Sequence, residues 1–288
     1  MSKIKDLFTA EHTVFSFEIF PPKRNDDIDT IYDTIEELHN LEPDFISVTY
    51  GASGSLADNK TCEIASTIKS RWGLESAAHL TCVNSSFEEI DIMLKRLEDN
   101  GIENILALRG DVVPDVPRKY DFAHASDLIT YIRSKGYDFG LSAACYPEAH
   151  PASVTVVEDI LNLKKKVDAG AEHLVSQLFF DNAMFYDFLD KARIAGITVP
   201  IEAGIMPVVN KKQIERMVSL CGASLPPKFT KMMQRYERRP EAMRDAGIAY
   251  ATNQIVDLLS HEVDGIHLYT MNNPLIAKRI SLNVKTLF

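Results

Sequence analysis

The sequence predicts a single (β/α)8 barrel, a TIM barrel, with an extra helical elaboration before its last strand. Eight short apolar segments with strand character alternate with amphipathic segments of helical length. The rival arrangement, an open doubly wound sheet, usually carries a G-x-G-x-x-G loop after its first strand, whereas this chain has P-P-K-R at 21–24. The length of 288 residues suits one such barrel, so residues 1–288 are predicted to form one domain.

Each predicted strand is a short apolar run, and each predicted helix is an amphipathic stretch that follows it. The strands are predicted at 14–20, 45–50, 77–82, 104–109, 140–146, 173–180, 199–206 and 265–271. The helices are predicted at 26–41, 58–72, 86–100, 124–135, 153–169, 182–195, 211–220 and 275–287. Glycines directly follow four of these helices, at 101, 136, 170 and 196, where the left-handed residue after a helix favours glycine.

The connection 221–264 is unusually long and is predicted to hold the helical elaboration. Five basic residues lie in it, and we interpret them as a solvated helix face. They are Lys228, Lys231, Arg235, Arg238 and Arg239.

The composition argues against several classes of protein. There are 31 basic and 41 acidic residues, so the formal net charge is −10, and general nucleic-acid binding is not expected. No apolar run approaches the roughly 18 residues needed to cross a bilayer, and the first residues lack an apolar signal core. The four cysteines form no C-x-x-C pair, so we expect reduced thiols and a cytoplasmic protein that does not bind a membrane.

The first strand places a carboxylic acid at the predicted barrel mouth. It reads V-F-S-F-E-I-F, so Phe15, Phe17 and Ile19 share one face and Ser16 and Glu18 share the other. The apolar face should pack against helices, which points Glu18 into the mouth, where active sites of such barrels lie. Partial desolvation would raise its pKa and suit a general acid. The alternative is a glutamate paired with a nearby cation.

Other strand ends carry polar side chains that could bind a ligand. His79 and Thr81 share a face of the third strand, and His267 and Tyr269 share a face of the last. A lone strand histidine is more often a hydrogen-bonded core residue than a ligand. Further candidates are Thr49 with Ser47, the run Arg109-Gly110-Asp111, Tyr146 and His150 in a loop stiffened by two prolines, and Gln177 in an apolar run.

The helix after the fifth strand carries a polar stripe. Asn162 and Lys166 lie four residues apart and share a face, and Asp159 and Lys165 lie nearby. The stripe could bind phosphate or ribose, or it could be a solvated face. The scattered histidines predict no metal site, and the absence of a G-x-S-x-G elbow gives no support for acyl transfer.

Eight of these segments, in order, resemble the bacterial methylenetetrahydrofolate reductase family. The matching pieces, which span 15–272, are F-S-F-E-I-F-P-P-K, S-V-T-Y-G-A, A-H-L-T-C, L-A-L-R-G-D, Y-P-E-A-H-P, N-L-K-K-K-V-D-A-G-A, Q-L-F-F-D and H-L-Y-T-M-N. The resemblance implies a barrel that binds FAD noncovalently and reduces 5,10-methylenetetrahydrofolate to 5-methyltetrahydrofolate.

The resemblance also implies residue roles. Glu18 matches the family's general acid, Asp111 matches an aspartate that contacts substrate and influences the flavin, and Gln177 and Tyr269 match substrate-site residues. The positions that match FAD contacts are Thr49, Tyr50, Ala52, His79, Arg109, Gly110, Asp111, Ala125, Tyr146, His150, Asp159, Asn162, Lys165 and Lys166. Family members are often homo-oligomers, so a homo-oligomer is expected.

Two positions depart from the family pattern. Lys211 stands where well-studied members have a phenylalanine that stacks on nicotinamide, and Asn273 stands where they have an arginine that helps hold substrate. The expected electron donor is therefore either NADH bound differently or an electron-donor protein subunit. Two other functions remain open at this stage: a flavin-free barrel lyase or aldolase, and a noncatalytic electron-transfer subunit.

Overall fold

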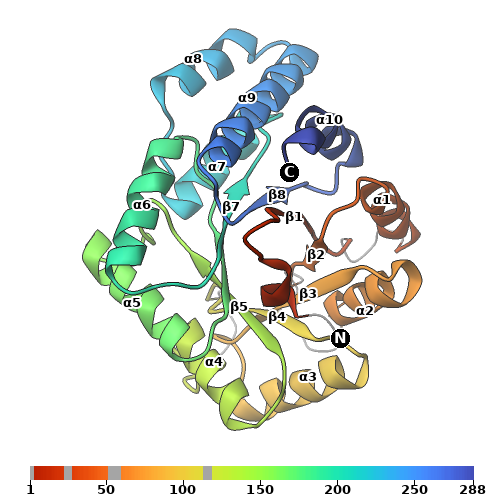
Figure 1. The fold of residues 1–288 in the computed structure, drawn as a ribbon, viewed down its shortest axis with the longest axis vertical. Helices are drawn as coiled ribbons and strands as arrows, with labels where there is room; N and C mark the ends of the chain where they lie inside the picture. Colours follow the sequence, from red (N-terminus) through yellow and green to blue (C-terminus); the bar gives the residue numbers. More distant parts are fainter. Residues whose placement is uncertain (1–2, 23–27, 51–59, 113–118) are drawn as a thin grey trace.

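Eight parallel strands close into one barrel in the computed structural model of the chain (Figure 1). The structure describes residues 3–22, 28–50, 60–112 and 119–288. The strands are β1 (Val14–Ile19), β2 (Phe45–Val48), β3 (Glu75–Thr81), β4 (Asn104–Leu108), β5 (Gly140–Cys145), β6 (His173–Ser176), β7 (Ile201–Ile205) and β8 (Gly265–Tyr269). Their order around the barrel follows the sequence, and β8 pairs with β1, which confirms the predicted fold class.

Helices follow the strands and cover the outside of the barrel. They are α1 (Asp29–His39), α2 (Thr61–Trp72), α3 (Phe87–Asp99), α4 (Ala125–Ser134), α5 (Val156–Asp168), α6 (Asn182–Ile194), α7 (Lys211–Cys221), α8 (Pro227–Tyr236), α9 (Pro240–Ser260) and α10 (Pro274–Val284). In these described residues, no helix is both long and apolar enough to cross a membrane. α5 begins three residues later than predicted, because the Thr155 side chain accepts a hydrogen bond from the backbone of Glu158 and caps it.

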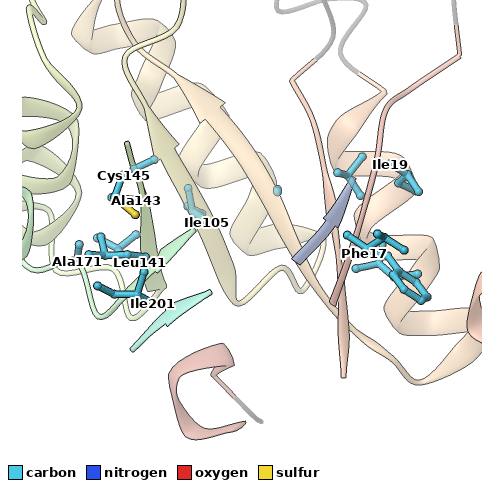
Figure 2. Close-up of a cluster of buried hydrophobic side chains, with 14 of the residues drawn as sticks. Phe17, Ile19, Ile105, Leu141, Ala143, Cys145, Ala171 and Ile201 are labelled. Carbon is cyan, nitrogen blue, oxygen red and sulfur yellow. The ribbon is translucent and has the colours of Figure 1, made fainter. Parts of the chain in front are cut away.

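The outward faces of the strands form the main core with the helices (Figure 2). Phe17 and Ile19 are fully buried in this cluster together with Leu141 and Ala143 of β5. The predicted alternation along the first strand is therefore confirmed, since Phe17 and Ile19 join the core while Ser16 and Glu18 contact side chains of β7 and β8 inside the barrel.

The amino end of the barrel is closed by the start of the chain. A 3-10 helix, η1 (Ile4–Leu7), places Ile4 in a small cluster with Val14, Phe45 and Ala77, and Phe8 packs against it. The backbone N–H of Ile4 donates to Oδ1 of the buried Asn104 at 2.9 Å. Water is thus kept from the interior at this end.

The helical elaboration lies between β7 and β8, in the segment predicted for it. α9 packs against β7 and also contacts α6 and α10, so it belongs to the outer helical layer of the barrel. α7 and α8 add a second small core, in which Ile214 and Phe229 pack with Phe180 and Met206 from the ends of β6 and β7. The five basic residues of the connection are exposed, as predicted, but only Lys228, Lys231 and Arg235 lie on a helix; Arg238 and Arg239 lie between α8 and α9.

The prediction of a long sixth strand was wrong at its carboxyl end. β6 ends at Ser176 instead of residue 180, because the Gln177 side chain accepts the backbone hydrogen bond of Leu178 and the chain leaves the sheet. The apolar residues Leu178 and Phe180 are buried because they pack in the α7–α8 core, and not because they belong to a strand of the barrel. A run of apolar residues cannot by itself distinguish these two kinds of burial.

Candidate active site

A pocket of about 390 Å³ opens at the carboxyl ends of β4 and β5. The amino end of α4 and one face of α5 form its other walls. It brings together ten of the predicted flavin-contact residues: Arg109, Gly110, Asp111, Ala125, Tyr146, His150, Asp159, Asn162, Lys165 and Lys166. Its size is in the range of small-molecule sites, and its walls combine cationic, anionic and amide groups.

A glycine shapes the strand end that borders this pocket. Gly110 has a φ of +77°, and a Cβ there would lie 2.8 Å from Cβ of Thr81, so a side chain would be strained and crowded. The tight turn carries Arg109 and Asp111 on either side of it. Arg109 Nε donates to the carbonyl of Gly110 at 3.1 Å, and the carbonyl of Asp111 accepts from Asn84 at 2.7 Å, which fixes the loop.

The polar stripe on α5 lines the pocket. Of the two interpretations left open by the sequence, a ligand-binding face and a solvated face, the structure favours the first. Lys166 donates to the carbonyl of Ala144 at 2.8 Å, and burial lowers the pKa of its ammonium. Asp159 is buried and accepts from Ser153 at 2.7 Å, while Lys165 donates to Asn162 at 2.9 Å. Cations held inside a pocket in this way suit phosphate groups.

Two rings from the loop after β5 stand at right angles in the pocket wall. The centroids of Tyr146 and His150 lie 4.7 Å apart in an edge-on arrangement. Burial raises the pKa of Tyr146 to about 12, so its hydroxyl is a donor at neutral pH. The backbone N–H of Ala152 donates to Nδ1 of His150 at 2.9 Å, so a neutral His150 carries its proton on Nε2.

The remaining predicted flavin-contact residues lie elsewhere. Thr49 and Tyr50 follow β2, where the N–H of Thr49 donates to the carbonyl of Ile19 at 2.9 Å. His79 is inside the barrel beside Glu18. Ala52 lies outside the described residues. The roles of all these positions toward a flavin stay predictions.

Glu18 lies at the barrel mouth, with 19% of its side chain exposed. Its Oε2 is 3.6 Å from Nε2 of His79 and 3.6 Å from Nε2 of His267. Burial lowers the pKa of His79 to about 4, so that ring is neutral at physiological pH. The sequence alternative, a glutamate paired with a nearby cation, therefore does not describe the contact with the neutral His79.

The backbone of Glu18 is clamped to the end of β8. Its carbonyl accepts from the Thr270 hydroxyl at 2.6 Å. Asn272 donates to the carbonyl of Phe20 at 2.8 Å and accepts from the N–H of Phe20 at 3.0 Å. Sequence reasoning missed these two clamp residues as part of the site, although both belong to the strand-end segment H-L-Y-T-M-N.

Tyr269 and Gln177, the predicted substrate-site residues, also lie near the mouth. Tyr269 donates to the carbonyl of Ser176 at 2.7 Å, and burial raises the pKa of its phenol well above the ordinary value. A Cβ on Gly204 would lie 2.9 Å from the Tyr269 hydroxyl oxygen, so the glycine makes room for that ring. Gln177 turns its amide oxygen to its own neighbour, Leu178, at 2.9 Å.

A second pocket, of about 260 Å³, lies at the ends of β7 and β8 under α7. Asn273 and Tyr269 line it, together with Gln213 and Met217 of α7. The sequence did not indicate Gln213 and Met217, because they lie on a helix, whereas the sequence signal for a site is a polar residue at a strand end. The Asn273 side chain also accepts from the N–H of Ile276 and caps α10. Lys211 is not among the lining residues, and its ammonium lies 3.0 Å from Glu237 of the segment after α8.

A buried polar cluster fills the barrel below Glu18. Ser16, Glu202 and His267 are fully buried there, and His173 lies beside them. Strand alternation had singled out Ser16 and His267, but not Glu202 or His173. The available signal for Glu202 was a lone charge inside an apolar strand, I-E-A-G-I.

The structure is a (β/α)8 barrel with two pockets at the carboxyl ends of its strands and a carboxylic acid, Glu18, at its mouth. The sequence model of the family "Methylenetetrahydrofolate reductase" matches residues 3–285. The chain belongs to the methylenetetrahydrofolate reductase family.

Relatives from plants and bacteria support this assignment. An Arabidopsis thaliana protein named methylenetetrahydrofolate reductase (NADH) 1 is 40% identical over 99% of this chain and 50% of its own length. The chain thus spans about half the length of that relative. The Escherichia coli 5,10-methylenetetrahydrofolate reductase is 38% identical over 89% of this chain and 86% of its own.

Solved structures support the fold. A Clostridium thermocellum protein described as binding two copies of 5-methyl-5,6,7,8-tetrahydrofolic acid superposes with a TM-score of 0.68 at 14% identity, over 96% of this chain and 95% of its own. A Coxiella burnetii dihydropteroate synthase in complex with pteroic acid has a TM-score of 0.54 at 12% identity, over 97% of this chain and 94% of its own.

We predict that His79 stays neutral in the folded protein far below its ordinary pKa of 6.5 and gains a proton only near pH 4. The unfolded chain binds that proton near 6.5, so the contribution of neutral His79 to stability falls as the pH drops from 6.5 toward 4. Histidine ring NMR across this range, with His79→Gln for assignment, measures the midpoint. A midpoint near 6.5 would contradict the buried, neutral assignment.

Proposed function

We propose that the protein reduces 5,10-methylenetetrahydrofolate to 5-methyltetrahydrofolate with noncovalent FAD, and that Glu18 is the general acid. The observation that carries the proposal is the place of Glu18. Its carboxyl group lies at the barrel mouth, clamped through the backbone to β8, 3.6 Å from the neutral His79. A half-buried carboxyl group with such neighbours can hold a proton and release it to a bound base. Family membership supports the choice of substrate.

The charges that line the pocket at β4 and β5 support the binding of an anionic dinucleotide there. Arg109, Lys165 and Lys166 supply positive charge within a protein whose net charge is −10, and the amino end of α4 opens into the same space. Asn162 and Asp159 offer polar groups for ribose hydroxyls. When bound, FAD would supply the hydride. Asp111, at the exposed rim of the pocket, is proposed to contact both substrate and flavin.

The chain's own residues would carry out the proton chemistry. Glu18 would donate its proton to the folate nitrogen that loses its bond to the methylene carbon, as the five-membered ring opens to an iminium. Tyr269 and Gln177 would line the substrate site, with Asn273 in the adjacent pocket. One proton passes from Glu18 to the nitrogen in each turnover and is replaced from solvent.

The other functions considered from sequence have less support. A lyase or aldolase that forms a Schiff base needs a lysine with a free amine at a strand end. Lys166 lies on α5 instead, with Nζ donating to the carbonyl of Ala144. A noncatalytic electron-transfer subunit would not need the Glu18 carboxyl held at the mouth. A homo-oligomer remains a prediction from the resemblance.

Glu18→Gln should lower folate reduction by about 10²–10⁴-fold, because the amide cannot donate the proton, while FAD content stays the same. The measurement is single-turnover reoxidation of the reduced flavin by methylenetetrahydrofolate, with FAD released by denaturation and quantified. Glu37→Gln, an exposed glutamate on α1, is the matched control and should behave as wild type. Unchanged turnover in Glu18→Gln would remove Glu18 from the mechanism, and a colourless protein without FAD would favour the lyase.

We propose that the electron donor is either NADH, bound without a stacking ring at position 211, or a reduced carrier protein. Lys211, at the start of α7, forms an ion pair with Glu237. Without a stacking partner, NADH should bleach the flavin slowly. Anaerobic stopped-flow with NADH, NADPH and a reduced carrier protein as separate donors measures this. Rapid bleaching by NADH alone would eliminate the carrier protein.

A further inference from the structure

The polar cluster inside the barrel is a series of close contacts that leads to Glu18. Ser16 donates to Oε1 of Glu202 at 2.7 Å, and the same Ser16 oxygen lies 2.6 Å from Nδ1 of His267. The other nitrogen of that ring, Nε2, faces Oε2 of Glu18 at 3.6 Å. Four side chains from β1, β7 and β8 therefore connect in series.

The cluster is sealed from solvent on the side opposite the mouth. Phe45 lies with its ring centroid 6.3 Å from that of His267, and Phe8 packs 4.8 Å from His173. Gly265 leaves space for the Glu202 side chain, since a Cβ there would lie 2.8 Å from Cγ of Glu202. A carboxylate in such a place needs charged or hydrogen-bonded partners. The Ser16 hydroxyl donates to Oε1 of Glu202, and Nε2 of His173 lies 3.0 Å from Oε2 without forming a hydrogen bond of good geometry.

This geometry determines where the His267 proton lies. A serine hydroxyl has one hydrogen, and Ser16 gives it to Glu202. Ser16 can then only accept from His267, so Nδ1 of that ring carries a hydrogen. A neutral His267 is left with a bare Nε2, an acceptor that has no hydrogen-bond partner and faces Glu18.

We propose that Glu202 and Ser16 lock His267 in its Nδ1–H tautomer, and that the bare Nε2 then keeps the Glu18 carboxyl group in its protonated, acid form. Glu202, Ser16 and His267 are thus positioning residues, because they act on the reaction only through Glu18. The inference rests on the proposed function of Glu18 as the general acid.

The remaining groups around Glu18 fit this assignment. His79 from β3 is neutral, and Tyr269 from β8 is a phenol at neutral pH. The His–Glu arrangement also suggests a metal site, but within the described residues no three such groups converge to hold a metal ion. The 3.6 Å between Nε2 of His267 and Oε2 of Glu18 exceeds a hydrogen bond, so the two atoms are in close contact without a direct bond in this structure.

The tautomer can be measured directly on the purified protein. The ¹⁵N chemical shifts of a histidine ring distinguish Nδ1–H, Nε2–H and the imidazolium. We expect Nδ1–H for His267 in the wild type at pH 7. In Glu202→Gln the amide can donate to Ser16, whose hydroxyl then turns to Nδ1, so we expect Nε2–H. An imidazolium in the wild type, or an Nδ1–H tautomer that survives in Glu202→Gln, would overturn the lock.

The pH profile of folate reduction tests the effect on Glu18. With the lock removed, the Nε2–H tautomer of His267 can donate to the Glu18 carboxylate. The loss of rate at high pH should therefore begin about one pH unit lower. This corresponds to about a tenfold lower rate above the transition. Glu202→Gln and Ser16→Ala should shift the profile in the same direction, because Oε2 of Glu202, at 4.0 Å, is too far to replace Ser16. If either Glu202→Gln or Ser16→Ala fails to fold, the other still tests the lock.

Ser76→Ala is the matched control. Ser76 is a buried strand serine that donates to the carbonyl of Ala65 at 2.9 Å and does not touch the cluster, so its profile should superimpose on the wild type. If Glu18→Gln abolishes folate reduction but Glu202→Gln and Ser16→Ala keep the wild-type profile, the lock is wrong and the proposed function stands. If the wild type does not reduce methylenetetrahydrofolate, the proposed function fails, and the tautomer of His267 still decides the lock.

Discussion

Closure of eight parallel strands is the constraint on which the site depends. In a closed barrel every second side chain points inward, and the carboxyl ends of all strands meet at one face. Glu18, His79 and His267 come from β1, β3 and β8, yet closure of the barrel places Oε2 of Glu18 3.6 Å from each of the two histidine rings. The same closure brings the ends of β4 and β5 together around the larger pocket.

The interior of this barrel is unusual in how much polarity it buries. Layers of apolar side chains normally fill such a barrel. Here Ser16, Glu202 and His267 occupy the space below the mouth, and Ser16 of β1 contacts both His267 of the neighbouring β8 and Glu202 of β7. Buried polar groups cost free energy unless they are hydrogen-bonded. A role in setting the protonation of Glu18 gives the cluster a function that an apolar core could not provide.

Much of the architecture could be predicted from the sequence, because the strand period and the glycines after helices are local signals. The inward placement of Glu18 also followed from alternation alone. The end of β6 could not be predicted, because the side chain of Gln177 competes with the backbone only in the folded geometry. Nor could the position of Glu202 be interpreted, since its partners lie about 30 and 190 residues away. The separation of His79 from the larger pocket likewise depends on three-dimensional closure.

The most direct test of the account is a crystal structure of the protein with FAD and a bound tetrahydrofolate. The central claim is that the Glu18 carboxyl group is the acid that reaches the folate. The account predicts an Oε of Glu18 within about 3.2 Å, or one water, of the nitrogen that is released from the methylene carbon. A complex in which Glu18 stays turned toward His79 while another acidic group or solvent alone contacts that nitrogen would contradict it.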